Sequence, residues 1–181
     1  MIVFFGQPGA GKTTQGKMLA ANQDWCWIAA GQLLRKSDDP LVVQKLKDGK
    51  LVPPEVIIEL IGQALSENSN CKDIVIDGFA RCVEQADWLI KQAPAYNRSV
   101  DMVFVIDIPK EELIKRLISS GRADDAPETI ESRLNVYDEE TYPVLEYFKQ
   151  QGVKVVHIDG VGTEAQVNAR VMEELKTCKL V

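Results

Sequence analysis

The sequence predicts an α/β fold, in which helices cover both faces of a parallel sheet. Short apolar runs alternate along the chain with longer segments of helical periodicity, as expected for strands and helices in turn. The apolar runs are nearly continuous, which is typical of parallel strands buried on both faces. The chain has 181 residues, of which 45% are hydrophobic, so we expect one domain with a substantial core.

Five of the apolar runs are predicted to be strands. In chain order they cover residues 2–5, 25–28, 74–76, 102–106 and 153–158. The segments between them are long enough for the helical crossovers that parallel pairing requires. Because ligands bind at the carboxyl ends of the strands in such sheets, the residues just after each run are the first candidates for a site.

Proline and glycine mark the boundaries of the intervening helices. Pro40 and Gly49 bound one helix, with proline just inside the start and glycine just past the end. Residues 53–54 are both proline and open the next helix. Pro127 is expected to start a helix that Pro143 must kink or divide, because proline removes a backbone donor.

The segment 6–13 reads Gly-Gln-Pro-Gly-Ala-Gly-Lys-Thr and matches the phosphate-loop pattern. Its glycines let backbone N–H groups converge on an anion, and the helix that follows directs the positive end of its dipole to the same point. Lys12 would lie near the β and γ phosphates of a nucleoside triphosphate, and the hydroxyl of Thr13 could bind Mg²⁺. The other predicted phosphate-binding residues are Gly9, Ala10, Gly11 and Thr14.

The third run leads into residues 77–81, which read Asp-Gly-Phe-Ala-Arg. A carboxylate at the end of a strand that faces a phosphate loop is placed to hold Mg²⁺ through water. The alternative is that Asp77 only caps the turn at Gly78. We favour the magnesium role because of the loop that Asp77 would face, and Arg81 would then project into the same crevice.

Composition and charge restrict the partners. A net charge of −6 argues against polymeric nucleic acid or an anionic membrane surface. No apolar run approaches the roughly 20 residues of a membrane span, and we expect no signal peptide. The cysteines are scattered without a Cys-x-x-Cys pair, so we expect reduced, packed thiols in a cytoplasmic protein, at Cys26, Cys71, Cys82 and Cys178.

Further motifs follow the phosphate loop in a fixed order: residues 14–15, 31–35, 49–53 and 77–81, Gln85, residues 121–125, and Arg133. Together they resemble the nucleoside monophosphate kinases, and most closely an adenylate kinase with a short lid. The resemblance spans nearly the whole chain and implies a three-layer P-loop NTPase fold with strand order 2-3-1-4-5. It also implies one domain over residues 1–181, a monophosphate-binding insert at about 30–60 and a short lid at about 116–126.

The resemblance also implies the reaction and the roles of the site residues. Phosphoryl transfer from MgATP to AMP would give two ADP, carried out by a monomer that acts on free nucleotides. Arg35 and Arg81 would hold the α-phosphate of the acceptor, while Arg122 and Arg133 would reach the transferring phosphoryl group and the donor. The remaining residues implied to line the acceptor site are Gly31, Val52, Gly78 and Gln85.

The acceptor base has two interpretations. Gln85 stands where adenylate kinases carry a glutamine, and its amide matches the edge of adenine. The alanines at residues 29–30 lack the hydroxyl usual in adenylate kinases and are more similar to UMP/CMP kinases. We favour AMP, with CMP or UMP as the alternative. A small-metabolite kinase and a regulatory nucleotide-binding protein without kinase activity are two further hypotheses.

Several residues depart from the family pattern, among them Gln32, which replaces an acidic residue in the monophosphate helix. Thr13 replaces a glycine, so the hydroxyl of either Thr13 or Thr14 could serve Mg²⁺. Ala80 replaces a proline that is typically cis, and we expect a trans bond because cis costs about 2.5–4 kcal/mol before a residue other than proline.

Leu117 is a further departure, because it stands where short-lid kinases carry a glycine. In one alignment Arg116 grips phosphate; in the other it lies against the adenine of the donor and the lid pivots at Gly121. We favour the second, because a helical leucine cannot supply the flexible hinge of a glycine. A third interpretation makes Arg116 a solvated helix charge. His157, the only histidine, is expected to pack or cap rather than to catalyse.

Overall fold

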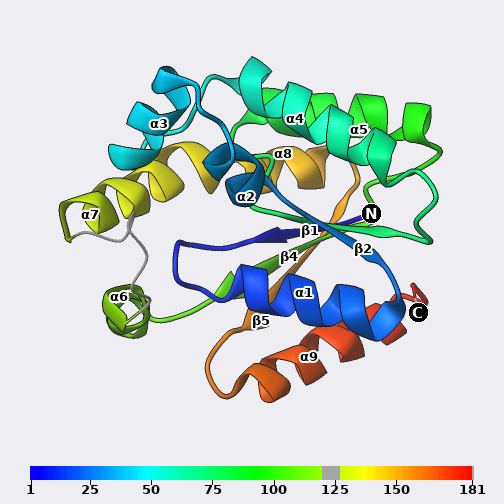
Figure 1. Ribbon diagram of the computed structural model, residues 1–181. Helices are drawn as coiled ribbons and strands as arrows, with labels where there is room; N and C mark the ends of the chain where they lie inside the picture. The colour runs from blue at the N-terminus through cyan, green and yellow to red at the C-terminus, as the bar shows by residue number, and fades with distance from the viewer. Residues whose placement is uncertain (120–126, 181) are drawn as a thin grey trace.

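The protein forms one all-parallel sheet with helices on both faces (Figure 1). The computed structural model describes residues 1–119 and 127–180. The strand order is β2-β3-β1-β4-β5, which confirms the order that the family resemblance implied. The strands are β1 (Ile2–Phe5), β2 (Cys26–Ala29), β3 (Ile74–Asp77), β4 (Met102–Asp107) and β5 (Lys154–Asp159).

Each face of the sheet has its own hydrophobic core, because neighbouring residues of a strand point to opposite faces. In β1, Ile2 and Phe4 pack toward one face, while Val3 and Phe5 pack toward the other. Figure 1 shows which helices cover each face. One face carries α1 (Lys12–Gln23) and α9 (Glu164–Thr177), and the other carries α4 (Pro54–Glu67), α5 (Val83–Gln92) and α8 (Val144–Gln150).

Four further helices lie near the carboxyl ends of the strands, where they can frame a site (Figure 1). They are α2 (Ala30–Arg35), α3 (Pro40–Lys47), α6 (Lys110–Ser119) and α7 (Pro127–Val136). A 3₁₀ turn at Ala93–Tyr96 follows α5, and a π-helical turn at Tyr137–Thr141 follows α7.

The predicted helix boundaries agree with the structure. The carboxylate of Asp39 accepts a hydrogen bond from the backbone N–H of Leu41 at 2.8 Å, and Pro40 begins α3. Gly49 follows the helix with φ +66°, a conformation that favours glycine. The helix that begins at Pro127 is divided, as expected, since the π-helical turn precedes Pro143 and α8 follows it.

The prediction that all four cysteines are reduced is wrong. Cys26 and Cys71 form a disulfide with a Cα–Cα distance of 5.9 Å, while Cys82 and Cys178 are free thiols. Cys26 begins β2 and pairs with Ile74 of β3, and Cys71 lies in the turn just before β3. Sheet pairing therefore brings together two cysteines separated by 45 residues, and their spacing in the sequence carries no sign of this.

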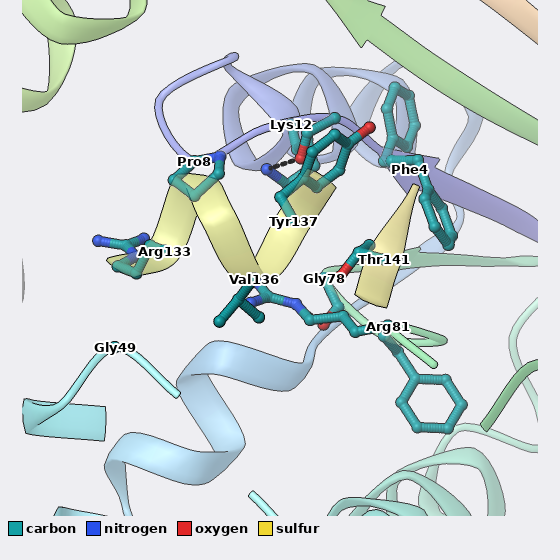
Figure 2. Close-up of a pocket in the computed structure, with 13 residues that line it drawn as sticks. Phe4, Pro8, Lys12, Gly49, Gly78, Arg81, Arg133, Val136, Tyr137 and Thr141 are labelled. Atoms are coloured by element: carbon teal, nitrogen blue, oxygen red, sulfur yellow. Dashed lines mark hydrogen bonds between the residues drawn. The ribbon is translucent and has the colours of Figure 1, made fainter. Parts of the chain in front are cut away.

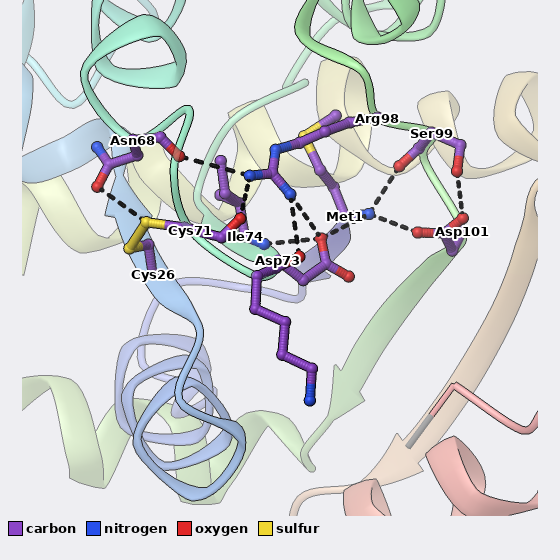
Figure 3. A network of polar contacts seen from close by, with 10 residues as sticks. Met1, Cys26, Asn68, Cys71, Asp73, Ile74, Arg98, Ser99 and Asp101 are labelled. Carbon is purple, nitrogen blue, oxygen red and sulfur yellow. Dashed lines mark hydrogen bonds and ion pairs between the residues drawn. A yellow bond between two sulfur atoms is a disulfide. The ribbon is translucent and has the colours of Figure 1, made fainter.

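A polar network around this disulfide holds the amino-terminal end of the sheet (Figure 3). The guanidinium of Arg98 donates to the backbone oxygens of Cys71 at 2.6 Å and Asn68 at 3.4 Å. Arg98 also forms an ion pair with Asp73 at 3.5 Å, and the terminal amine of Met1 lies 3.2 Å from the same carboxylate. The carboxyl end of the sheet, where a ligand is expected, lies at the opposite end of the strands.

Candidate functional site

The phosphate-loop motif connects β1 to α1 at the carboxyl end of the central strand. Gly9 and Gly11 have φ values of +84° and +96°, which are readily adopted only by glycine. Gly9 also has no room for a side chain, because an added Cβ would lie 2.9 Å from Cγ of Leu117. The ammonium of Lys12 turns back over the loop and donates to the carbonyl oxygens of Gly6 and Gln7 at 2.7 and 2.8 Å.

An oxygen pair suited to a hard cation lies beside this loop. The hydroxyl of Thr13 donates to Oδ2 of Asp77 at 2.6 Å, and Asp77 is only 5% exposed. Asp77 ends β3 and pairs with Phe4 of β1, so the sheet register places its carboxylate next to the loop. In the described part of the chain, no group of three or more His, Cys, Asp or Glu could enclose a metal. The pair fits Mg²⁺, which proteins commonly hold through one or two oxygens together with substrate phosphates.

A cleft of about 990 Å³ runs along the phosphate loop, from α2 at one end to the connection between β5 and α9 at the other. It brings together residues from distant motifs of the chain. Cationic side chains gather around it in a protein whose net charge is −6, as focused binding of an anion requires. The sequence-predicted residues that line it are Gly9, Ala10, Gly11, Lys12, Thr13, Thr14, Gly31, Arg35, Asp77, Gly78, Arg81, Arg116 and Arg133.

Backbone carbonyls of their own motifs orient two of these arginines. Nη1 of Arg35 donates to the carbonyl oxygen of Gly31 at 3.1 Å, one helical turn earlier in α2. Nε of Arg81 donates to the carbonyl oxygen of Gly78 at 3.0 Å, across the turn that follows β3. Figure 2 shows Lys12, Arg81 and Arg133 around a smaller cavity beside the cleft.

Val52 and Gln85 line a neighbouring cavity of about 820 Å³ instead of the main cleft. Both are buried, with 5% and 3% of their surface exposed. Oε1 of Gln85 accepts a hydrogen bond from the backbone N–H of Arg81 at 2.9 Å. Part of the amide that the sequence assigned to the acceptor base is therefore used within the protein.

The sequence of the chain is similar to those of known proteins over most of its length. The family model for adenylate kinase matches residues 4–153. The chain belongs to the adenylate kinase family.

Curated relatives match over almost their full length. An adenylate kinase from Mycobacteroides abscessus is 37% identical over 180 residues, covering 96% of this chain and 98% of the relative. An adenylate kinase from Parabacteroides distasonis is 35% identical over 188 residues, covering 98% of both chains. One from Corynebacterium glutamicum is 34% identical over 180 residues, covering 96% of this chain and 98% of the relative.

The turn at Ala80 has an unusual backbone conformation. The described residues contain no cis peptide bond, so the bond between Phe79 and Ala80 is trans, as predicted. Ala80 has φ +58° and is fully buried. A residue other than glycine is strained in this left-handed region, so the contacts around Ala80 must hold the turn in place.

Arg116 lies between the phosphate loop and the segment that connects β5 to α9. Its Nε donates to Glu112 at 3.0 Å and its Nη2 to the carbonyl oxygen of Gly160 at 3.3 Å. The neighbouring Leu117 is helical and only 2% exposed, so it is a packing residue and supplies no hinge. Gly121 and Arg122, on which the expected lid also depends, lie outside the described residues.

Sequence reasoning missed several residues that line the site. Gly160, Gly162 and Thr163 form one end of the cleft, and their position directly after the fifth strand was an available signal. Gly160 is tightly enclosed, since an added Cβ would lie 2.5 Å from Cγ2 of Ile106.

The π-helical turn contributes two more lining residues, Tyr137 and Thr141, with no comparable sequence signal. Burial, together with the nearby carboxylate of Asp107, raises the pKa of the Tyr137 phenol. His157 is exposed and lies 2.7 Å from the Asp107 carboxylate, so the expectation that it packs or caps is wrong.

Proposed function

We propose that this chain catalyses reversible transfer of the γ-phosphoryl group of MgATP to AMP, which yields two molecules of ADP. The observation that carries this proposal is that one cleft contains the phosphate loop, the oxygen pair of Thr13 and Asp77, and the arginines of separate motifs. Family membership over nearly the whole chain supports the same reaction.

On the donor side, Gly9 to Thr14 would surround the β and γ phosphates with backbone N–H groups and the N-terminus of α1. Lys12 would exchange the carbonyl oxygens of Gly6 and Gln7 for phosphate oxygens. Thr13 and Asp77 would hold Mg²⁺ directly or through water, with the hydroxyl of Thr14 as the alternative ligand. The bound ion would supply charge neutralisation on the phosphates.

On the acceptor side, Arg35 and Arg81 would bind the α-phosphate of AMP. Guanidinium groups suit this role because they can donate two parallel hydrogen bonds to phosphate oxygens. The tethers to the carbonyls of Gly31 and Gly78 support it, since they restrict both side chains before the acceptor arrives. Val52 and Gln85 would contact the base.

Transfer itself needs alignment and charge stabilisation more than a protein base. Arg133 and Arg122 would stabilise the transferring phosphoryl group, and Arg116 would lie against the donor base. The insert at about 30–60 and the lid at about 116–126 would exclude water, which otherwise competes as acceptor. Two contacts support closure of the insert: the hydroxyls of Thr129 and Ser132 donate to the carbonyl oxygens of Lys47 and Asp48, at 3.4 and 3.1 Å.

We also propose that the chain acts as a single-domain monomer on free nucleotides in the cytoplasm, without polymeric nucleic acid as a partner. The acidic net charge supports the last point. Within residues 1–119 and 127–180, no helix is both long and apolar enough to cross a membrane. The cysteines do not support the assignment to a reducing compartment, because two of the four form a disulfide.

The test is phosphoryl transfer from MgATP to a panel of AMP, CMP, UMP, GMP and shikimate. We expect AMP to give the highest kcat/KM. A preference for CMP or UMP would favour the alternative suggested by the alanines at residues 29–30, which offer no hydroxyl to an adenine. Binding of ATP without transfer to any acceptor would instead indicate a regulatory protein.

A further inference from the structure

Gln85 makes a contact that recognition of a base would not require. It lies in the first turn of α5, is 3% exposed, and its Oε1 accepts the backbone N–H of Arg81 at 2.9 Å. Only the amide oxygen can accept from an N–H group, so this hydrogen bond fixes the orientation of the amide. The amino group Nε2 is left as the donor of the side chain.

The backbone N–H of Arg81 belongs to a turn whose conformation is unfavourable on its own. Gly78 and Ala80 have φ values of +72° and +58°, and the second of these is strained for a residue with a Cβ. Such conformations persist where surrounding contacts over-determine them. The N–H of the peptide between Ala80 and Arg81 is the one that donates to Gln85. The Gln85 side chain therefore stabilises the strained turn at the residue that follows it.

Two hydrogen bonds then fix Arg81 itself. Its backbone N–H is held by Gln85, and its Nε is held by the carbonyl oxygen of Gly78 at 3.0 Å. Loss of the first bond would let the peptide rotate out of the left-handed turn. Rotation there would move the guanidinium away from the cleft that it lines.

We propose that Gln85 is a positioning residue for Arg81, so that one side chain serves both the acceptor base and the grip on the acceptor phosphate. This inference rests on the proposed function in its assignment of Arg81 to the acceptor phosphate. Its distinguishing consequence is that Gln85 affects the binding of an acceptor that has no base.

The probe is ribose 5-phosphate, which keeps the sugar and phosphate of AMP. Gln85→Met preserves the size of the side chain and removes the acceptor, Gln85→Glu keeps an acceptor oxygen, and Gln92→Ala is a control at the exposed end of the same helix. Dissociation constants for ribose 5-phosphate and AMP are measured by NMR titration, and hydrogen exchange of the Arg81 amide is followed in each variant.

We expect Gln85→Met to weaken ribose 5-phosphate binding roughly five- to tenfold, the effect of one ordinary hydrogen bond. Exchange of the Arg81 amide should accelerate by a similar factor. Gln85→Glu should restore protection of that amide, while Gln92→Ala should match the wild type in both measurements. Ribose 5-phosphate binding at the wild-type level in Gln85→Met, or an Arg81 amide that stays protected, would overturn the proposal.

These measurements need no turnover, so they separate two failures. Absence of transfer from MgATP to AMP by the wild-type protein would contradict the proposed function alone. Unchanged exchange of the Arg81 amide in Gln85→Met would contradict the positioning role alone, even in a fully active enzyme.

Discussion

Reduction of the disulfide between Cys26 and Cys71 should lower thermal stability without changing catalysis. The bridge joins residues 45 apart, and cross-linking a loop of this length in the unfolded chain corresponds to about 4 kcal/mol in the chain-entropy model. Residual structure in the unfolded chain reduces that figure, so we expect about 2–4 kcal/mol. For a protein of this size, the loss corresponds to a fall in Tm of roughly 5–15 °C.

Reduction of the disulfide should leave the enzymatic activity unchanged although it lowers the thermal stability. The bridge lies at the amino-terminal end of β2 and β3, whereas the cleft lies at the carboxyl end of the sheet. At 25 °C, where both forms are folded, kcat and the KM for AMP should therefore be the same before and after reduction.

The assay is differential scanning calorimetry with and without dithiothreitol, together with a count of free thiols in denaturant. Cys26→Ser/Cys71→Ser should melt at the temperature of the reduced wild type and ignore the reductant. Cys82→Ser/Cys178→Ser, which removes the two free thiols, should respond as the wild type does. A wild-type Tm that stays within about 1 °C, although all four thiols become reactive, would refute the reasoning.

Three further predictions concern the site. Lys12→Met should lower kcat by about 10²- to 10³-fold with little change in Tm, because the ammonium acts on developing charge; equal kcat in steady-state assays would exclude that role. Ala80→Gly should raise the free energy of unfolding in urea by roughly 0.5–1 kcal/mol, because glycine adopts φ +58° without strain, and a loss of stability would contradict the strain. Gly49→Ala should lower the free energy of unfolding by about 1–2 kcal/mol and raise the KM for AMP. The reason is that φ is +66° and the new Cβ would lie 3.0 Å from side-chain carbons of Arg133 and Thr129. An unchanged Tm and unchanged kinetics would show that the insert adjusts at no cost.

Local patterns predicted the elements of the fold well. Apolar runs located five strands to within about a residue or two, and proline and glycine located the ends of α3 because their backbone preferences are intrinsic. The phosphate loop was also predictable, since its glycines, Lys12 and Thr13 are consecutive in the sequence.

Contacts between distant segments were not predictable in the same way. The bridge between Cys26 and Cys71 depends on the pairing of β2 with β3, which no local pattern specifies. The use of the Gln85 oxygen by Arg81 depends on the left-handed turn at Ala80, which no local pattern specifies. Tyr137 lines the smaller cavity from the π-helical turn before Pro143, and no local pattern marks that turn.

The network around Arg98 and Asp73 has a consequence for how the protein can change over evolutionary time. It ties the amino-terminal end of the sheet with ion pairs and backbone hydrogen bonds, a strand length away from the nucleotide cleft. Substitutions that lower or raise thermal stability can accumulate at the amino-terminal end of the sheet, while selection on turnover acts at the carboxyl end. We therefore expect heat tolerance and substrate preference to be separable traits in this protein, open to independent engineering from opposite ends of the same strands.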